Sequence, residues 1–184
     1  MCAIQSTPRL ATDRLVLRAP GLQDAARIAD LINDLDVARM LTRVPHPYAL
    51  TNAEDFIGRM SAERRAGDQA LVIEHREMGP IGVVGLHPQP APSPLGFTLQ
   101  PELGYWLGRT FWGRGFATEA VSAVLSWARD ALGFRALASG HFADNPASGR
   151  VLAKADFLYT GEVQTRVSLA RQEAAPTRMM VWLA

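Results

Sequence analysis

Residues 102–120 read Glu-Leu-Gly-Tyr-Trp-Leu-Gly-Arg-Thr-Phe-Trp-Gly-Arg-Gly-Phe-Ala-Thr-Glu-Ala. The first part, residues 102–107, is short and rich in aromatic and aliphatic side chains, and Pro101 and Gly108 bound it. This pattern is typical of a buried strand. The stretch as a whole therefore predicts a strand, a glycine-containing turn and the beginning of a helix.

The turn after this strand contains small residues at alternate positions, namely Gly113, Gly115 and Ala117. Small residues let backbone N–H groups approach a ligand closely, and glycine accepts a positive φ. From Thr118 onward, apolar residues recur at helical spacing: Val121, Val124, Leu125, Ala128, Ala131 and Leu132. A helix that begins directly after such a turn offers unpaired N–H groups and the positive end of its dipole. The pattern therefore predicts an anion site, with phosphate as the usual ligand.

Two common phosphate-binding patterns do not fit this turn. The ATP-binding loop requires Gly-x-x-x-x-Gly-Lys-Ser/Thr, which the sequence lacks. The dinucleotide pattern Gly-x-Gly-x-x-Gly is matched by Gly113 and Gly115, but Thr118 replaces the third glycine and the region around Arg135 supplies no acid. A nicotinamide-dependent oxidoreductase is therefore disfavoured. A tight strand-to-helix connection without a ligand is an equally good explanation of this turn taken alone.

A second motif lies downstream, where residues 144–157 read Asp-Asn-Pro-Ala-Ser-Gly-Arg-Val-Leu-Ala-Lys-Ala-Asp-Phe. Together with Trp-Gly-Arg-Gly-Phe-Ala at 112–117, it resembles the GNAT acyltransferase superfamily. Members of that superfamily carry a Gln/Arg-x-x-Gly-x-Gly/Ala pyrophosphate loop and an Asn-x-x-Ser motif at the start of the next helix, matched here by Asn145 and Ser148. The chain is most similar to the branch that acetylates the amino termini of ribosomal proteins.

The resemblance extends to residues 10–18 and to Gly-Tyr-Trp-Leu at 104–107, so it covers nearly the whole chain. Two positions depart from the pattern. Trp112 stands where the wider superfamily usually has Gln or Arg, and Asp156 stands where a glycine usually precedes the Phe. Because a glycine there would end the helix in a left-handed turn, we expect Asp156 to adopt that conformation with local strain.

The resemblance implies an α/β fold, formed as a single domain over residues 1–184. In this fold a mixed, mostly antiparallel sheet is flanked by helices, and its two central strands splay apart. Apolar patterning predicts strands at residues 14–18, 70–75, 81–86, 102–107, 136–142, 157–167 and 177–183. It predicts helices at 23–35, within 39–48, and at 51–66, 118–132 and 145–154, with Thr51 and Glu54 as a capping box and Gly67 as a stop. Residues 89–100 are expected to form a proline-rich loop, with 97–99 extending the next strand.

The resemblance also implies acetyl-CoA as the acetyl donor, a primary amine as the acceptor and no metal ion. The pantetheine arm is expected to pair with free backbone groups of the central strand. The residues expected to contact the coenzyme are Trp106, Leu107, Gly113, Arg114, Gly115, Ala117, Thr118, Asn145 and Ser148. The acceptor is expected to be a small molecule or a peptide N-terminus. By analogy with the family, residues 40–48 are expected to determine which acceptor binds. It is an equally good interpretation that these residues form an ordinary surface loop without that role.

Glu102 is the preferred general base, because the resemblance places the start of the central strand on the acceptor side of the cleft. A solvated carboxylate at the strand end is an equally good interpretation. His87 and His141 are rivals, since an imidazole titrates near neutrality. We expect His87 to have a structural role in a loop, and His141 to be half-buried within a strand.

Ser148 is expected to protonate the departing thiolate or to hydrogen-bond the pantetheine, while Asn145 caps the helix. Tyr159 follows that helix and is an alternative acid. A backbone amide near Leu107 is expected to polarise the thioester carbonyl. Cys2 lies at a terminus, so direct transfer is favoured over a cysteinyl intermediate.

Composition excludes several other classes of protein. Apolar residues at 48% and charged residues at 20% are ordinary for a globular protein, and a net charge of +1 gives no case for a nucleic-acid partner. One cysteine cannot build a disulfide framework or a zinc cluster. The sequence has no signal-peptide pattern and no apolar run near the roughly 18 residues of a membrane helix. We therefore expect a cytoplasmic monomer or homodimer without a membrane partner.

A second class of function also fits the motifs. An acyl-CoA-binding module that senses without catalysing would keep Gly113, Gly115 and Asn145. It would need neither Glu102 nor Ser148, so substitution of those two residues distinguishes it from an enzyme.

Overall fold

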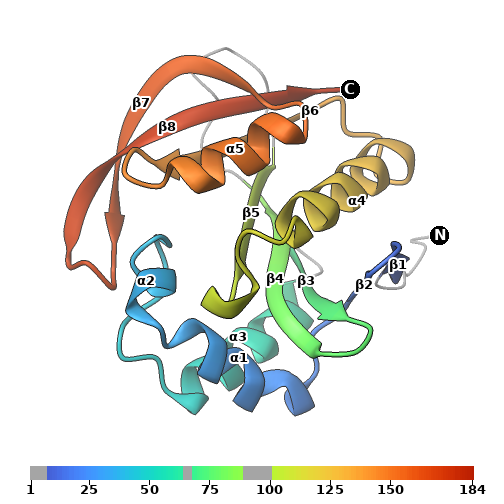
Figure 1. Cartoon of the computed structure of the whole chain (residues 1–184), viewed down its shortest axis with the longest axis vertical. Coiled ribbons are helices and arrows are strands. Elements are labelled where there is room, and N and C mark those ends of the chain that lie inside the picture. Colours follow the sequence, from blue (N-terminus) through green and yellow to red (C-terminus); the bar gives the residue numbers. More distant parts are fainter. Residues whose placement is uncertain (1–7, 64–67, 89–100) are drawn as a thin grey trace.

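The computed structural model describes residues 8–63, 68–88 and 101–184 (Figure 1). Within these residues, eight strands form one sheet in the order β1-β2-β3-β4-β5-β6-β8-β7. The strands are β1 (Leu10–Ala11), β2 (Leu15–Arg18), β3 (Gln69–His75), β4 (Gly79–His87), β5 (Glu102–Leu107), β6 (Ala136–Phe142), β7 (Leu158–Ser168) and β8 (Glu173–Leu183). The helices are α1 (Ala25–Ile32), α2 (Leu35–Ala38), α3 (Leu50–Glu63), α4 (Phe116–Asp130) and α5 (Pro146–Lys154). The predicted α/β fold is confirmed, while the predictions for Cys2, Gly67 and residues 89–100 lie outside the described residues.

The first half of the sheet, from β1 to β5, is antiparallel between all neighbouring strands. Only three residues, 76–78, separate β3 from β4, so these strands pair as a hairpin. Both strands are apolar on both faces, because helices cover the sheet on both sides.

The sheet opens between β5 and β6, which run parallel and pair at one register position, Glu102 with Ala138. Just beyond it, Ser139 Oγ donates a hydrogen bond of 2.8 Å to the carbonyl oxygen of Leu103. Both strands continue past this point, to Leu107 and Phe142, without a further register pair in the described part of the chain. The predicted splay is therefore confirmed, and it leaves the edge of β5 open to a ligand.

Helices form a layer on each face of the sheet (Figure 1). The core on one face joins Leu103 of β5 to Phe116 of α4 and Leu152 of α5. The core on the other face packs α1 and α3 against β3 and β4. Successive side chains of β5 alternate between these layers, as the pleat of a strand requires. Tyr105 consequently reaches α5, whereas Trp106 contacts the α1–α3 core.

The hairpin of β7 and β8 is longer than predicted, because β8 begins at Glu173 and includes Pro176. The polar residues and the proline around position 176 suggested a loop. Pro176 is tolerated because it lies opposite Thr165 where β6 has already ended, and its carbonyl oxygen still accepts a hydrogen bond of 2.8 Å from Ala143 N–H.

The helix boundaries correct the sequence prediction in the first third of the chain. α1 ends at Ile32, and the short helix predicted within 39–48 lies earlier, as α2. Asp34 determines where α2 begins, because its Oδ1 accepts a hydrogen bond of 2.8 Å from Asp36 N–H. α3 begins at Leu50, which places Thr51 inside the helix, so the predicted capping box is wrong.

Candidate active site

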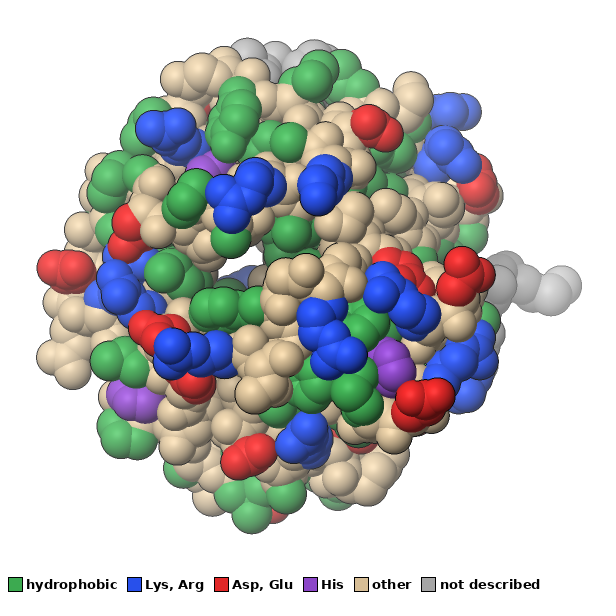
Figure 2. Space-filling view, viewed as in Figure 1, with side chains coloured by type: hydrophobic (Ala, Val, Ile, Leu, Met, Phe, Trp, Pro, Cys, Tyr) green, Lys and Arg blue, Asp and Glu red, His purple; other side chains and the backbone are tan. Residues whose placement is uncertain are grey.

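The splay between β5 and β6 opens into a cleft of about 380 Å³. Its walls come from β5, β6, the start of α4, one side of α5, the segment after α2 and the β7–β8 hairpin. Figure 2 shows the surface hollowed at this place, between α5 and α2. The cleft therefore joins the glycine turn at its α4 end to Glu102 and Arg166 at its hairpin end.

The turn before α4 has the backbone geometry that the two glycines predicted. Gly113 has a φ of 74° and Gly115 a φ of 81°, both in the left-handed region where glycine is favoured. Gly115 is the N-cap of α4, and no side chain caps the helix there. The first N–H groups of α4 are thus available to an anionic ligand at the wall of the cleft.

Arg114 lies outside the lining of the cleft, although its neighbours line it. Its guanidinium lies 5.0 Å from the centroid of the Phe116 ring, and its Nη1 lies 3.9 Å from Met78 Sδ on the connection between β3 and β4. The side-chain contact expected from Arg114 to a phosphate is therefore not available in this arrangement. Two cations that sequence reasoning missed, Arg150 and Lys154 of α5, line the cleft instead.

Trp106 and Leu107 of β5 both line the cleft. The indole Nε1 of Trp112 donates a hydrogen bond of 2.8 Å to the carbonyl oxygen of Leu107, which ties the end of β5 to the glycine turn. Trp112 therefore has a structural role at the position where the wider superfamily usually has Gln or Arg.

Asn145 and Ser148 meet at the start of α5, where Asn145 Oδ1 accepts a hydrogen bond of 3.1 Å from Ser148 N–H. Ser148 Oγ lies 2.8 Å from the hydroxyl of Tyr105, and that hydroxyl also donates to the carbonyl oxygen of Ser148 at 3.0 Å. Burial raises the pKa of Tyr105, and the hydrogen bond with Ser148 offsets this effect only in part. Sequence reasoning missed Tyr105, whose hydroxyl is held inside the cleft in its protonated form.

Glu102 forms an ion pair of 2.5 Å with Nη1 of Arg166 on β7. Gln164 Oε1 accepts hydrogen bonds from Nε and Nη2 of the same guanidinium, at 3.2 Å and 3.0 Å. The alternative of a purely solvated carboxylate is therefore wrong for Glu102. Arg166 lines the cleft beside it and was not predicted as a site residue.

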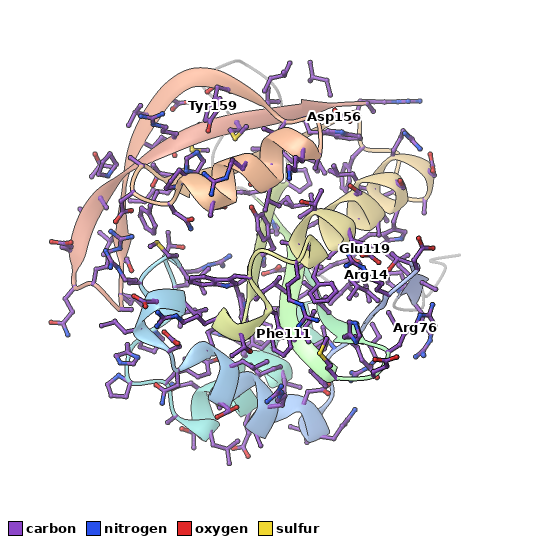
Figure 3. All side chains as sticks on the ribbon, in the orientation of Figure 1. Arg14, Arg76, Phe111, Glu119, Asp156 and Tyr159 are labelled. Carbon is purple, nitrogen blue, oxygen red and sulfur yellow. The ribbon has the colours of Figure 1, made fainter. Side chains whose placement is uncertain are left out.

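The two rival histidines are both engaged within the fold. His141 is buried, with Nδ1 2.8 Å from the carbonyl oxygen of Phe142 and Nε2 2.9 Å from the Tyr159 hydroxyl. Since a carbonyl can only accept, Nδ1 carries a proton, while the hydrogen bond between Nε2 and the Tyr159 hydroxyl can run in either direction. Tyr159 lies outside the cleft lining and half-exposed on β7, so it is not placed to act as the acid (Figure 3). His87 is part of β4 rather than a loop, and it pairs with Asp68 at 2.5 Å.

The cleft lining thus brings together nearly all of the predicted site residues: Glu102, Trp106, Leu107, Gly113, Gly115, Ala117, Thr118, Asn145 and Ser148. Within residues 8–63, 68–88 and 101–184, no three His, Cys, Asp or Glu side chains gather to hold a metal ion. No helix in the same part of the chain is long and apolar enough to cross a membrane.

Comparison with known proteins assigns the family. The description "Acetyltransferase (GNAT) domain" matches residues 14–158. The chain belongs to the GNAT acetyltransferase family. It is accordingly an acetyl-CoA-dependent acetyltransferase.

Three relatives illustrate the similarity. The uncharacterized N-acetyltransferase YoaA of Bacillus subtilis is 30% identical over 162 residues, which cover 84% of this chain and 85% of YoaA. The ribosomal-protein-S5-alanine acetyltransferase of Vibrio fischeri superposes with a TM-score of 0.78 at 16% identity and covers 96% of each chain. The microcin C7 self-immunity acetyltransferase MccE, in complex with acetyl-CoA and AMP, gives a TM-score of 0.77 at 18% identity, over 94% of each chain. The two solved structures share the fold of this GNAT protein. The substrates named for them describe those two enzymes only.

Proposed function

We propose that this GNAT enzyme transfers the acetyl group of acetyl-CoA directly to a primary amine, which is carried by a small molecule or a peptide N-terminus. The observation that carries the proposal is the continuous cleft. It runs from the uncapped start of α4 through the splay beside β5 to the carboxylate of Glu102. One cleft can therefore hold a phosphate-bearing donor and an amine acceptor at the same time.

The residues of the cleft fit acetyl-CoA. The N–H groups that follow Gly113 and Gly115 would bind its diphosphate, with Ala117 and Thr118 in the first turn of α4. Trp106, Leu107 and Asn145 would border the pantetheine arm, along the free edge of β5 and the start of α5. When bound, acetyl-CoA supplies a thioester whose carbonyl carbon is the electrophile.

Arg150 and Lys154 would take the role expected of Arg114. They project from successive turns of α5, four residues apart, so they share one face of the helix. Both line the cleft that the N-terminus of α4 also borders. Their charges would favour the phosphates of the donor.

Formation of the new amide bond requires the acceptor amine to lose protons. The reaction forms a bond from the amine nitrogen to the acetyl carbon and breaks the bond from that carbon to sulfur. An ammonium acceptor loses two protons in the process, of which one ends on sulfur and one in solvent. Glu102 is the proposed acceptor of the first proton, directly or through water, because it is the carboxylate among the described residues of the cleft lining.

Ser148 is the proposed donor of a hydrogen bond or a proton to the leaving sulfur. The neighbouring phenol of Tyr105 fixes the position of Ser148 Oγ and has a proton of its own to pass on. A backbone N–H near the end of β5 would polarise the thioester carbonyl, as expected near Leu107.

One observation favours the alternative of a non-catalytic acyl-CoA sensor. The Glu102 carboxylate is already held by the Arg166 guanidinium at 2.5 Å, so it would have to leave this ion pair before it could accept a proton from an amine. A sensor would retain the donor side of the cleft and leave this ion pair undisturbed.

Two measurements test the proposal. Calorimetric titration should detect acetyl-CoA binding, and release of free thiol across a panel of amines should show turnover. Glu102→Gln should reduce kcat/KM by about 100-fold or more without weakening acetyl-CoA binding, because the base is lost while the coenzyme contacts remain. Binding of acetyl-CoA without turnover of any amine would instead support the sensor.

A further inference from the structure

The hairpin end of the cleft combines three polar side chains on one face of the sheet. Glu102 comes from β5, Arg166 from β7 and Thr177 from β8, and all three line the cleft. The surrounding lining includes the apolar residues Val37, Met40, Leu41 and Phe142, and the polar residues Thr42, Ser139 and His141. An acceptor bound here would meet the Glu102 anion, the Arg166 cation and the Thr177 hydroxyl beside apolar side chains.

Arg166 is held in place independently of Glu102. Gln164 Oε1 accepts from both Nε and Nη2 of its guanidinium, and Gln164 Nε2 in turn donates to Glu162 Oε1 at 2.8 Å. When Glu102 turns to another partner, the guanidinium therefore stays in position. Its Nη1 then needs a new anion, since an uncompensated charge in a largely buried site is costly.

Thr177 carries a buried polar atom that is unsatisfied within the described residues. The residue is 3% exposed, and its Oγ1 has no hydrogen-bond partner among the described residues. Buried hydroxyls are almost always paired, so an unpaired one on the wall of a cleft points to a ligand. Thr177 lies opposite Gln164 in the hairpin, and Arg166 follows two residues later on the same face. A group bound by Arg166 is thus within reach of Thr177.

We infer that the acceptor is a small zwitterion, a primary amine that also carries a carboxylate, with an apolar remainder. This inference rests on the proposed function and names its substrate class. The ammonium takes the place of Arg166 at Glu102, and the carboxylate takes the place of Glu102 at Arg166. One ion pair becomes two, so neither Glu102 nor Arg166 is left without a counter-charge. The planar fork of Arg166 suits a carboxylate, and Thr177 Oγ1 donates the additional hydrogen bond.

A peptide N-terminus is disfavoured as the acceptor, because Arg166 would lose its anion. Its first carbonyl belongs to a neutral amide, which cannot replace the carboxylate that Arg166 loses. A peptide would also have to continue past an apolar pocket closed at the hairpin tip, where Arg171 Nε donates to the carbonyl oxygen of Arg39 at 2.5 Å and Leu169 N–H to that of Thr42 at 3.1 Å.

The test compares acceptors that differ only in the carboxylate. Leucine, leucinamide and 3-methylbutylamine, and likewise phenylalanine and phenethylamine, are assayed for thiol release with the full-length enzyme and saturating acetyl-CoA. We expect kcat/KM for the amino acid to exceed that for the matched amine or amide by about 100-fold or more, because the amine or amide leaves the Arg166 guanidinium without an anion. Equal rates for all members of a set would overturn the inference while leaving the proposed function intact.

Variants assign the discrimination to residues. Arg166→Gln should bring the ratio between amino acid and amine close to one, and Thr177→Val should lower it about tenfold. Arg178→Gln is the matched control. Arg178 is exposed and follows Thr177 on the same strand, so its side chain lies on the opposite face of the sheet. An unchanged ratio in Arg166→Gln, with acetyl-CoA binding intact by calorimetry, would contradict the inference. If no acceptor in any set is acetylated although acetyl-CoA binds, the proposed function itself fails, and the inference fails with it.

Discussion

Tyr105 and Ser148 form a pair of hydroxyls inside the cleft, with 2.8 Å between their oxygens. Because burial raises the pKa of Tyr105, the phenol keeps its proton at neutral pH. It donates to the carbonyl oxygen of Ser148 at 3.0 Å, so the Ser148 hydroxyl is free to donate to the phenol or to a ligand. At the scale of single residues, Tyr105 thus fixes the position of the hydroxyl that sequence reasoning assigned as the acid.

Tyr105→Phe should therefore lower kcat about tenfold and leave the affinity for acetyl-CoA nearly unchanged, because it removes one hydrogen bond of about 1.4 kcal/mol without creating a cavity. Ser148→Ala should lower kcat by at least as much. The double variant should be no slower than Ser148→Ala, since both residues act through one hydroxyl. Steady-state kinetics and calorimetry check this prediction, and additive losses would contradict it.

Asp156 ends α5 in the left-handed conformation, with a φ of 64°, as the departure from the family pattern predicted (Figure 3). Asp156→Gly should raise the free energy of unfolding by about 1 kcal/mol, because glycine adopts this conformation without strain and removes a negative charge from the helix C-terminus. Gln172→Gly is the control, because Gln172 has a φ of 57° in the hairpin loop and does not lie at a helix end. Its free energy of unfolding should rise by less than that of Asp156→Gly. Urea denaturation measures both, and a loss of stability in Asp156→Gly would refute the explanation.

At the scale of elements, the turn between β5 and α4 joins the two halves of the cleft. Trp112 anchors it to the end of β5, and Gly113 and Gly115 turn the chain so that α4 begins at the cleft wall. The turn is also tied to the N-terminal segment, because Arg14 Nη1 donates to the carbonyl oxygen of Arg114 at 3.1 Å. The backbone conformation of this turn therefore provides the N–H groups of the proposed phosphate site, and Arg150 and Lys154 of α5 add positive charge beside it.

Gly113 and Gly133 form a matched pair for testing this role. Their φ values are 74° and 73°, and a Cβ built at either position meets no atom within 4 Å. Replacement by alanine should cost each variant a similar stability, about 1 kcal/mol. Only Gly113→Ala should weaken acetyl-CoA binding, by about tenfold or more, because it alone shifts the N–H groups at the start of α4. Equal affinities of the two variants in calorimetry would argue against the proposed phosphate site.

At the scale of the whole molecule, buried or half-buried ion pairs tie distant segments together. Glu119 of α4 accepts from Arg14 Nε at 2.7 Å and from Thr12 Oγ1 at 2.6 Å, and Figure 3 shows Arg14 and Glu119 pointing toward each other. Arg18, which forms an ion pair with Glu74 of β3, also donates two hydrogen bonds to the nearby Asp24, at 2.7 Å and 2.8 Å. Burial alone would raise the pKa of the Glu119 and Asp24 carboxyls, but these hydrogen bonds outweigh it and hold each pKa below its ordinary value.

The sign of the pH dependence follows from these shifts. A carboxyl whose pKa is lower in the folded state stabilises the fold fully above its unfolded value, here 3.8 for Asp24 and 4.5 for Glu119, and loses that contribution as the pH falls through the folded value. The free energy of unfolding should therefore decrease below about pH 4.5. Asp24→Asn should lose about 2 kcal/mol at pH 7 and show a shallower decrease in acid. Urea denaturation between pH 3 and 7 tests this, and a parallel decrease in variant and wild type would contradict it.

Much of the site could be predicted from local sequence, because its backbone-dependent parts are encoded locally. Gly113, Gly115, Asn145 and Asp156 each act through the conformation or cap of their own segment, and short motifs reveal such positions. Tyr105 and Ser148 are 43 residues apart, and Glu102 and Arg166 are 64 residues apart. Those pairs depend on how elements distant in the sequence pack together: β5 against α5 in the first pair, and β5 near β7 in the second.

The positions of two candidate side chains that do not line the cleft, Arg114 and Tyr159, have the same origin. Arg114 belongs to the motif, but the turn directs its side chain to Met78, which only the packing of β4 against α4 brings near. Tyr159 was placed near the acid position by sequence order, yet it pairs with His141. Sequence patterns thus located the segments of the cleft, while tertiary packing decided which side chains face it.

Initial rates with acetyl-CoA and an amine acceptor, both varied, test the central claim most directly, because one cleft that holds both substrates requires a ternary complex. Double-reciprocal plots should give lines that intersect, as expected for direct transfer. Parallel lines, together with an acetylated enzyme detected by mass spectrometry in the absence of acceptor, would show an acetyl-enzyme intermediate and contradict the account.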